Sequence, residues 1–111
     1  MTKRINAPCE RASREIIPVV KNLIANNLYA KGYTYKQIGE ILGVSATEIN
    51  YLIRGLRGTN ELRDILKKDK EFTELVESYV TSGEEFLSLC PLCSYVRRKV
   101  LNWSIICPYD I

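Results

Sequence analysis

The sequence predicts an all-α protein. Apolar residues recur at the three- and four-residue spacing of helices along most of the chain, and Ser or Thr capping signals open three of these stretches. No segment shows the apolar–polar alternation of a strand. With 111 residues, of which 46% are hydrophobic and 26% charged, the chain suits one small folded domain or a compact module with an extension.

Proline and glycine define the first helices. We expect a short helix over about 9–17 and a second one that starts at Pro18, because proline fits the first turn of a helix and breaks its interior. Gly32 suits the end of that second helix. Its apolar face would consist of Val20, Leu23, Ile24 and Leu28, with Lys21, Asn22 and Asn26 on the other face.

Two further short helices are each expected to begin with a capping box. Thr34 and Gln37 form the first box, and the helix that follows carries Ile38, Ile41 and Leu42 and should end at Gly43. Ser45 and Glu48 form the second, and the apolar residues of its helix are Ile49, Leu52 and Ile53, with a stop at Gly55 or Gly58. Since only Gly43 and Val44 separate the two, they must fold against each other at a steep angle.

The segment from Tyr35 to Arg54 satisfies the requirements of a helix-turn-helix. Gly43 supplies the left-handed turn position, and Gly39 stands where close crossing of the second helix leaves room only for a small side chain. Apolar residues occupy the expected contact positions: Ile38, Leu42, Val44, Ile49 and Leu52. The stretch resembles the DNA-binding motif of repressors of the lambda and Cro type.

More closely, the first 58 residues resemble an archaeal family of helix-turn-helix transcriptional regulators. The residues that carry this resemblance are Pro8-Cys9-Glu10, the Ile17–Pro18 junction, the turn from Gly39 to Ser45, and Gly55-Leu56-Arg57-Gly58. The chain departs from the pattern at Ala46, where such domains often have Gln. The resemblance implies a helix-turn-helix DNA-binding domain over residues 1–60. The apolar spacing and the cysteines after it predict a helical, cysteine-rich dimerisation region over residues 61–111.

The polar face of the second helix of the motif is the candidate DNA-reading surface. At 100° per residue, Thr47, Asn50, Tyr51 and Arg54 lie opposite the apolar stripe and would face the major groove. Asn50 can pair with adenine, Arg54 with guanine or a phosphate, and the methyl group of Thr47 can meet thymine. Lys36, Gln37 and Arg57 are candidate phosphate contacts, and Ser45 and Ala46 complete the predicted interface.

Beyond Thr59 the helical spacing continues with one polar interruption at Asp69. The apolar residues fall near a heptad seam, which predicts either a homodimer interface or part of the core of the monomer. Ser82-Gly83-Glu84-Glu85 should cap a further helix, Cys90-Pro91-Leu92-Cys93 should form a tight turn, and Ser94 to about Leu101 should be the last helix. The tail around Trp103 is expected to be irregular. The seam comprises Leu62, Ile65, Phe72, Val76, Tyr79 and Phe86.

Four cysteines, Cys9, Cys90, Cys93 and Cys107, leave three interpretations open. They could bind a [4Fe–4S] cluster, which takes four thiolates and commonly uses one closely spaced pair together with a Cys-Pro such as Cys107-Pro108. They could hold Zn²⁺, although structural zinc sites usually show two closely spaced pairs. Finally, they could bind no metal, with Cys9 and Cys107 buried and Cys90 and Cys93 free or disulfide-bonded.

Composition and charge limit the function classes. The absence of histidine removes the commonest general base and any Ser-His or Cys-His dyad, so we expect no enzyme activity and no small-molecule substrate. The net charge of +3 is uneven: residues 1–60 carry +5 and residues 61–111 carry −2. No apolar run could span a bilayer and no secretory signal is evident, which predicts a cytoplasmic protein without a membrane partner.

The sequence therefore predicts a sequence-specific transcriptional regulator that binds double-stranded DNA as a homodimer and responds to redox state or iron if a cluster is present. Two alternatives remain. One is a thiol–disulfide oxidoreductase that uses Cys90 and Cys93, although the βαβ context usual for that motif is missing. The other is a zinc-stabilised adaptor that binds protein or RNA through the same helices.

Overall fold

The computed structural model describes residues 8–56, 61–82 and 88–102, with side chains from Ala12 onward. These segments form seven α-helices and one π-helical turn and contain no strand, so the predicted all-α class is confirmed. None of these helices combines the length and the apolar character that crossing a bilayer requires. The elements are α1 (Pro8–Glu15), α2 (Ile17–Ala30), α3 (Tyr35–Leu42), α4 (Ala46–Ile53), α5 (Glu61–Lys68), α6 (Lys70–Thr81), α7 (Cys90–Tyr95) and η1 (Val96–Val100).

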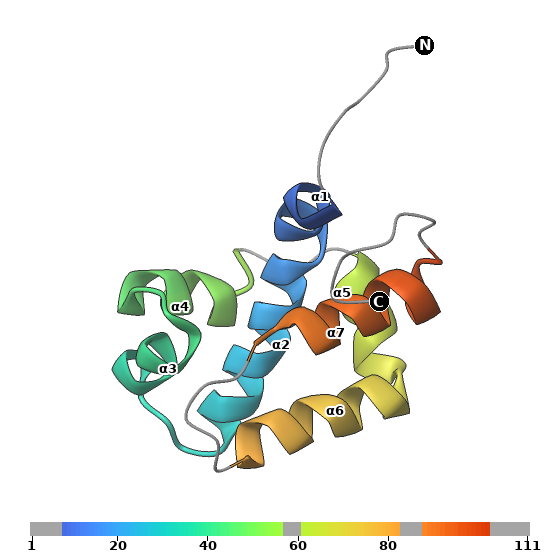
Figure 1. Ribbon diagram of the computed structural model, residues 1–111. Helices are drawn as coiled ribbons and strands as arrows, with labels where there is room; N and C mark the ends of the chain where they lie inside the picture. The colour runs from blue at the N-terminus through green and yellow to red at the C-terminus, as the bar shows by residue number, and fades with distance from the viewer. Residues whose placement is uncertain (1–7, 57–60, 83–87, 103–111) are drawn as a thin grey trace.

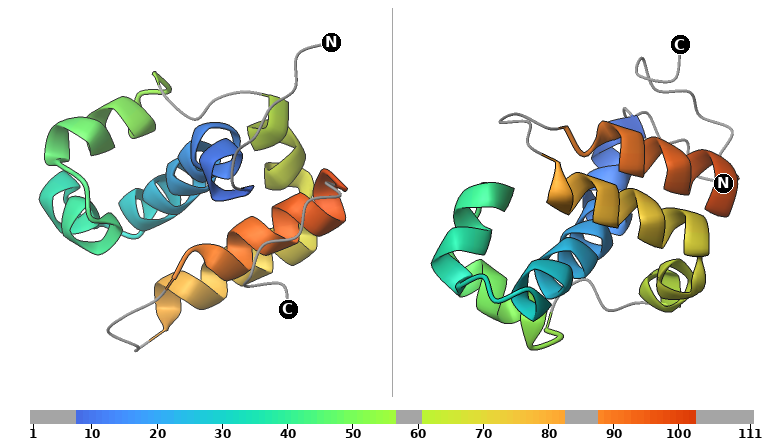
Figure 2. Two further views of the ribbon diagram at one scale, coloured as in Figure 1. Left: turned by 45° about the horizontal axis from the view of Figure 1, so that its top comes forward. Right: turned by 90° about the horizontal axis from the view of Figure 1, so that it is seen from below.

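Helix α2 is the centre of the molecule. It packs against each of the other six α-helices, and Figure 2 shows it between the α3–α4 pair and a layer made by α5, α6 and α7. The sequence explains this position, because the apolar residues of α2 are spread around much of its circumference. Its buried residues are Val19, Val20, Asn22, Ile24, Ala25 and Leu28. One hydrophobic core therefore joins the parts of the chain before and after residue 60.

Local signals set the ends of α1 and α2 as expected. Pro18 lies in the first turn of α2, and Ile16 separates α2 from α1 because proline has no amide hydrogen to continue the ladder of α1. Gly32, with φ of +96°, follows the end of α2 in the left-handed region. One prediction about α2 is wrong. Asn22 was expected on the polar face, but its side chain is completely buried.

The second half of the chain departs from the predicted heptad seam. Asp69 ends α5 and caps α6, since its Oδ1 accepts from the amide of Phe72 at 2.9 Å. Leu62, Phe72 and Val76 are buried in the core of the chain itself, which favours the core interpretation for these three, whereas Ile65 remains 51% exposed. Phe86 and the predicted cap at residues 82–85, apart from Ser82, lie outside the described residues.

The Cys-Pro-Leu-Cys segment is also different from its prediction. It forms the first turn of α7 instead of a tight turn, because Pro91 occupies an early helical position whose amide hydrogen would have no partner within the helix. The amide of Cys93 donates to the carbonyl of Leu89 at 2.9 Å. The last predicted helix changes to π-helical geometry over Val96–Val100, with Arg97 buried. The tail from Trp103 lies outside the described residues.

Candidate nucleic-acid interface

Two hydrogen-bonded caps fix where α3 and α4 begin. The hydroxyl oxygen of Thr34 accepts from the amide of Gln37 at 3.1 Å, and Gln37 Oε1 accepts from the amide of Thr34 at 2.9 Å, which is the predicted capping box. Of the second predicted box, the structure shows the Ser45 half, in which Ser45 Oγ accepts from the amide of Glu48 at 3.1 Å. Both caps anchor the helix N-termini that a DNA-binding surface would use.

The turn between α3 and α4 depends on two glycines. Gly43 adopts the left-handed conformation at φ +73°, and the amide of Val44 donates to the carbonyl of Gly39 at 2.9 Å. A Cβ atom on Gly39 would lie only 2.6 Å from the carbonyl oxygen of Val44, a distance that real Cβ atoms essentially never show. Position 39 therefore admits glycine and little else, as the sequence predicted.

Apolar contacts hold α3 and α4 against α2. Ile38 and Ile49 are fully buried and Leu52 nearly so, while Leu42 and Val44 are partly buried against the same core. Helices α3 and α4 pack on each other and each also packs on α2. This packing buries the apolar side of α4, so the polar residues of α4 point away from the core.

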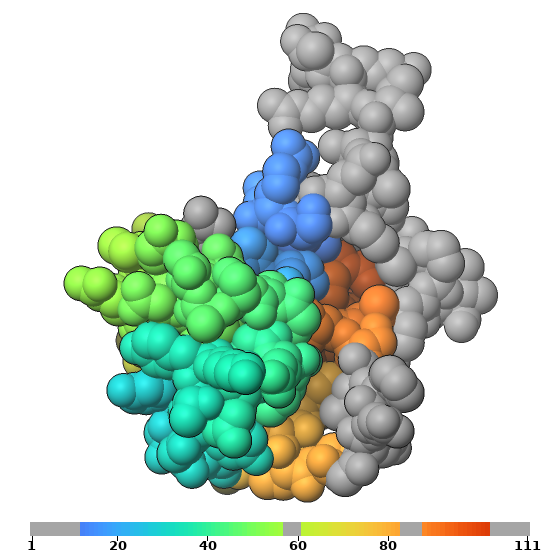
Figure 3. Space-filling model, turned by 90° about the vertical axis from the view of Figure 1, so that its left-hand side faces the viewer, coloured from blue at the N-terminus to red at the C-terminus, as the bar shows by residue number. Residues whose placement is uncertain are grey.

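The predicted contact residues of α4 come to the surface. Ala46, Thr47 and Arg54 are exposed, and Asn50 and Tyr51 are half-buried on the same helix. Figure 3 shows α3 and α4 side by side on one face of the molecule. Arg54 follows α4 directly as its C-terminal cap residue, with its amide bonded to the carbonyl of Asn50 at 2.9 Å.

The residues predicted to contact phosphate are only partly described. Lys36 and Gln37 are exposed in the first turn of α3, and Ser45 is exposed just before α4. The capping box uses Gln37 Oε1, so the side-chain nitrogen of Gln37 is the group that could donate to a phosphate. Arg57 lies outside the described residues.

The predicted cysteine cluster can be judged at two of its four positions. Cys90 is exposed and Cys93 half-buried; both are free thiols. Since they are three residues apart in α7, they share one face of that helix and could direct two thiolates to the same point. The backbone of Cys9 belongs to α1, but its side chain and the whole of Cys107 lie outside the described residues. Within the described part of the chain, no three His, Cys, Asp or Glu side chains gather as a metal site.

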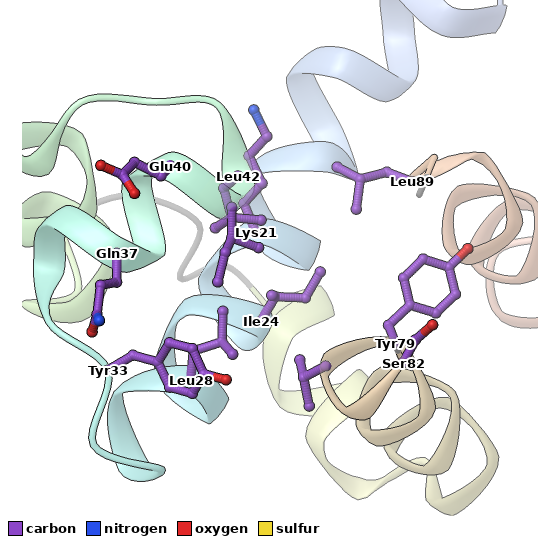
Figure 4. A pocket seen from close by; sticks show the side chains of 12 residues that line it. Lys21, Ile24, Leu28, Tyr33, Gln37, Glu40, Leu42, Tyr79, Ser82 and Leu89 are labelled. Atoms are coloured by element: carbon purple, nitrogen blue, oxygen red, sulfur yellow. The ribbon is translucent and has the colours of Figure 1, made fainter. Parts of the chain in front are cut away.

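A groove lies on the side of α3 that faces α6. It has a volume of about 790 Å³, with apolar side chains of α2 as its floor and Ile41, itself 56% exposed, on its α3 wall. Figure 4 shows Tyr79 and Ser82 on the opposite wall. The groove could not be predicted from the sequence, because it depends on how α6 is placed relative to α3.

Comparison with known proteins adds no assignment. No family model matches the chain, and no curated protein or solved structure matches it.

Proposed function

We propose that this chain is a transcriptional regulator that binds specific double-stranded DNA sites through α4, acts as a homodimer and works in the cytoplasm. Helix α4 would enter the major groove, and the N-terminal turn of α3 would lie against the phosphate backbone. The same proposal includes membership of the archaeal helix-turn-helix family that the motifs of residues 8–58 resemble.

The observation that supports this proposal best is the turn at Gly39 and Gly43. A crossing so close that a Cβ on Gly39 would meet the Val44 carbonyl at 2.6 Å brings α3 and α4 together at their junction. Glycine at positions 39 and 43 loses more conformational entropy on folding than other residues would. We infer that this entropy is spent because the tight turn presents α4 on the surface. The same turn leaves Arg54 exposed and Asn50 half-buried on the outward side of α4, where both could reach a duplex.

Each polar residue has a role in this proposal. Asn50 would pair with an adenine through its amide, and Arg54 would bind guanine or a phosphate. Thr47 would meet a thymine methyl group, with Tyr51 beside it. Lys36 and Gln37 would contact phosphates and set the register of the protein on the duplex, with Ser45, Ala46 and Arg57 completing the contact surface.

The first experiment selects bound duplexes from a random library and then measures affinities at several salt concentrations. Asn50→Ala should weaken binding to the selected duplex by about 1–3 kcal/mol and leave binding to unrelated duplexes unchanged. Lys36→Ala should weaken binding to all duplexes alike, and it should reduce the slope of log affinity against log salt concentration by about 1. Arg98→Ala is the matched control, because Arg98 is an exposed cation of η1 at the end of the molecule remote from α4. Equal losses for Lys36→Ala and Arg98→Ala, or no preference among duplexes, would contradict the proposal.

The homodimer follows from the small contact area of one helix-turn-helix, since such proteins usually bind two half-sites one helical turn apart. Light scattering coupled to size exclusion measures it directly. The selected duplexes provide a second readout, because a dimer with two-fold symmetry selects a palindrome. A monomer that selects a single half-site would contradict this part of the proposal.

The cysteines are proposed to bind a [4Fe–4S] cluster, with Cys9, Cys90, Cys93 and Cys107 as ligands and a redox or iron response as the outcome. The shared face of Cys90 and Cys93 on α7 fits two of the four ligand positions. Protein purified without oxygen should contain about four iron and four sulfide per chain and absorb visible light. A colourless protein with one zinc, or with no metal, would support the other interpretations.

A further inference from the structure

Asn22 is a polar side chain in the middle of the core. It is 0% exposed, and its amide forms hydrogen bonds in two directions. Nδ2 donates to the carbonyl oxygen of Leu52 in α4 at 2.8 Å, and Oδ1 accepts from Arg63 Nε in α5 at 2.6 Å. Asn26 Nδ2 adds a third bond to the same Oδ1 at 3.1 Å. A buried amide with both ends bonded to different helices is a specific link between them.

The carbonyl of Leu52 is the point at which this link meets the proposed DNA-binding helix. Leu52 lies in the last turn of α4, where carbonyl groups lack partners within the helix. The amide of Gly55 reaches this oxygen at 3.3 Å, and Asn22 supplies the shorter bond. Leu52 directly follows Tyr51 and lies two residues after Asn50, both of which belong to the proposed DNA-binding surface. A shift at Leu52 would therefore move the surface that reads the bases.

Helices α4 and α5 both pack on α2. Helix α4 packs mainly on α2 and α3, and α5 packs mainly on α2 and α6, so neither is a main packing partner of the other. Figure 1 shows the two helices on opposite sides of α2. The oxygen and nitrogen of Asn22 belong to one rigid planar amide, so a bond from Arg63 that turns this amide also turns the donor that reaches Leu52.

We propose that Asn22 and Arg63 form a positioning clamp through which α5 sets the orientation of α4, and that loss of either bond lowers the discrimination between specific and unrelated DNA. The clamp, Asn22 and Arg63 together with the Leu52 carbonyl, touches no DNA itself. The proposal rests on the DNA-binding function proposed above, and it identifies α5 as the element through which the C-terminal half regulates that site.

The test is a double-mutant cycle with two matched controls. Asn22→Asp keeps an acceptor for Arg63 but removes the donor to Leu52, whereas Arg63→Met removes the bond on the α5 side. Glu77→Gln weakens a different polar link of α2, the one to α6 through Lys31 and Asn27, and so controls for lost stability. Arg98→Met removes the same charge as Arg63→Met from the exposed surface of η1.

Two readouts separate positioning from a merely structural role. The ratio of affinities for the selected and an unrelated duplex should fall about 10-fold in Asn22→Asp, because the Leu52 carbonyl then keeps only the longer bond from Gly55, and the salt slope should not change. Arg63→Met should lower the same ratio, and combining it with Asn22→Asp should add little. Amide hydrogen exchange of α4 in the absence of DNA should be faster in both variants than in the two controls.

Three results would overturn the clamp: an affinity ratio that is unchanged in Asn22→Asp, additive effects in the double variant, or α4 exchange that matches the controls. The exchange measurement needs no DNA. If the wild-type chain binds no duplex specifically, the proposed function fails, whereas the coupling of α5 to α4 is still decided by exchange of Asn22→Asp and Arg63→Met.

Discussion

The close approach of Gly39 to Val44 makes Gly39→Ala a quantitative test of the α3–α4 turn. Alanine in place of glycine in a helix interior normally stabilises by about 1 kcal/mol. Here the new Cβ would lie 2.6 Å from the Val44 carbonyl oxygen, whereas ordinary van der Waals contact begins at 3.4 Å. Overpacking of this kind costs about 1–3 kcal/mol, and the upper value applies because a backbone atom cannot rotate away.

The two effects leave a net loss of about 2 kcal/mol, which for a chain of this length corresponds to a Tm lower by about 8 °C. Thermal and urea unfolding followed by far-ultraviolet circular dichroism measures both quantities. Gly43→Asn is the control, because nothing lies within 4 Å of a Cβ at Gly43 and asparagine tolerates its φ of +73°. An unchanged or higher Tm for Gly39→Ala would refute the close crossing of α3 and α4.

Three further predictions concern caps and titrating groups. Ser45→Ala should lower the free energy of unfolding by about 1 kcal/mol in urea titrations, because the amide of Glu48 loses its acceptor. Hydrogen bonds from Lys31 and Asn27 lower the pKa of Glu77. The carboxylate of Glu77 therefore stabilises the fold above its ordinary pKa, and this contribution is lost as the pH falls. Glu77→Gln should flatten the acid limb of a plot of Tm against pH. Burial and then hydrogen bonding to Asp69 raise the pKa of Tyr95, so its contribution is complete below the ordinary tyrosine pKa and lost as the pH rises beyond it. Tyr95→Phe should flatten the alkaline limb, and an unchanged limb in either variant would contradict the pKa assignment.

Local chemistry explains what the sequence could predict. The cap at Thr34, the left-handed turn at Gly43 and the small residue at Gly39 each depend on neighbours within about one turn of the chain, and all three are present. The outward face of α4 was predictable for the same reason, since burying Ile49 and Leu52 determines which residues point away.

Features that depend on tertiary packing could not be predicted from the sequence. The helical spacing predicts Asn22 on a polar face, and only the approach of α4 and α5 to α2 shows that its amide has partners on both sides. The segment at Cys90 was ambiguous because Pro91 suits both a tight turn and the first turn of a helix. The signal that could have revealed the break at Asp69 was present, since aspartate is a favoured N-cap residue.

The measurement that tests the central claim most directly is a titration of isotope-labelled protein with the selected duplex, followed by amide chemical shifts. If α4 reads the duplex, the largest shift changes occur along the outward side of α4, around Thr47, Asn50 and Arg54, and in the first turn of α3 at Lys36. Changes confined to α6, α7 and η1, or identical changes with an unrelated duplex, would contradict it.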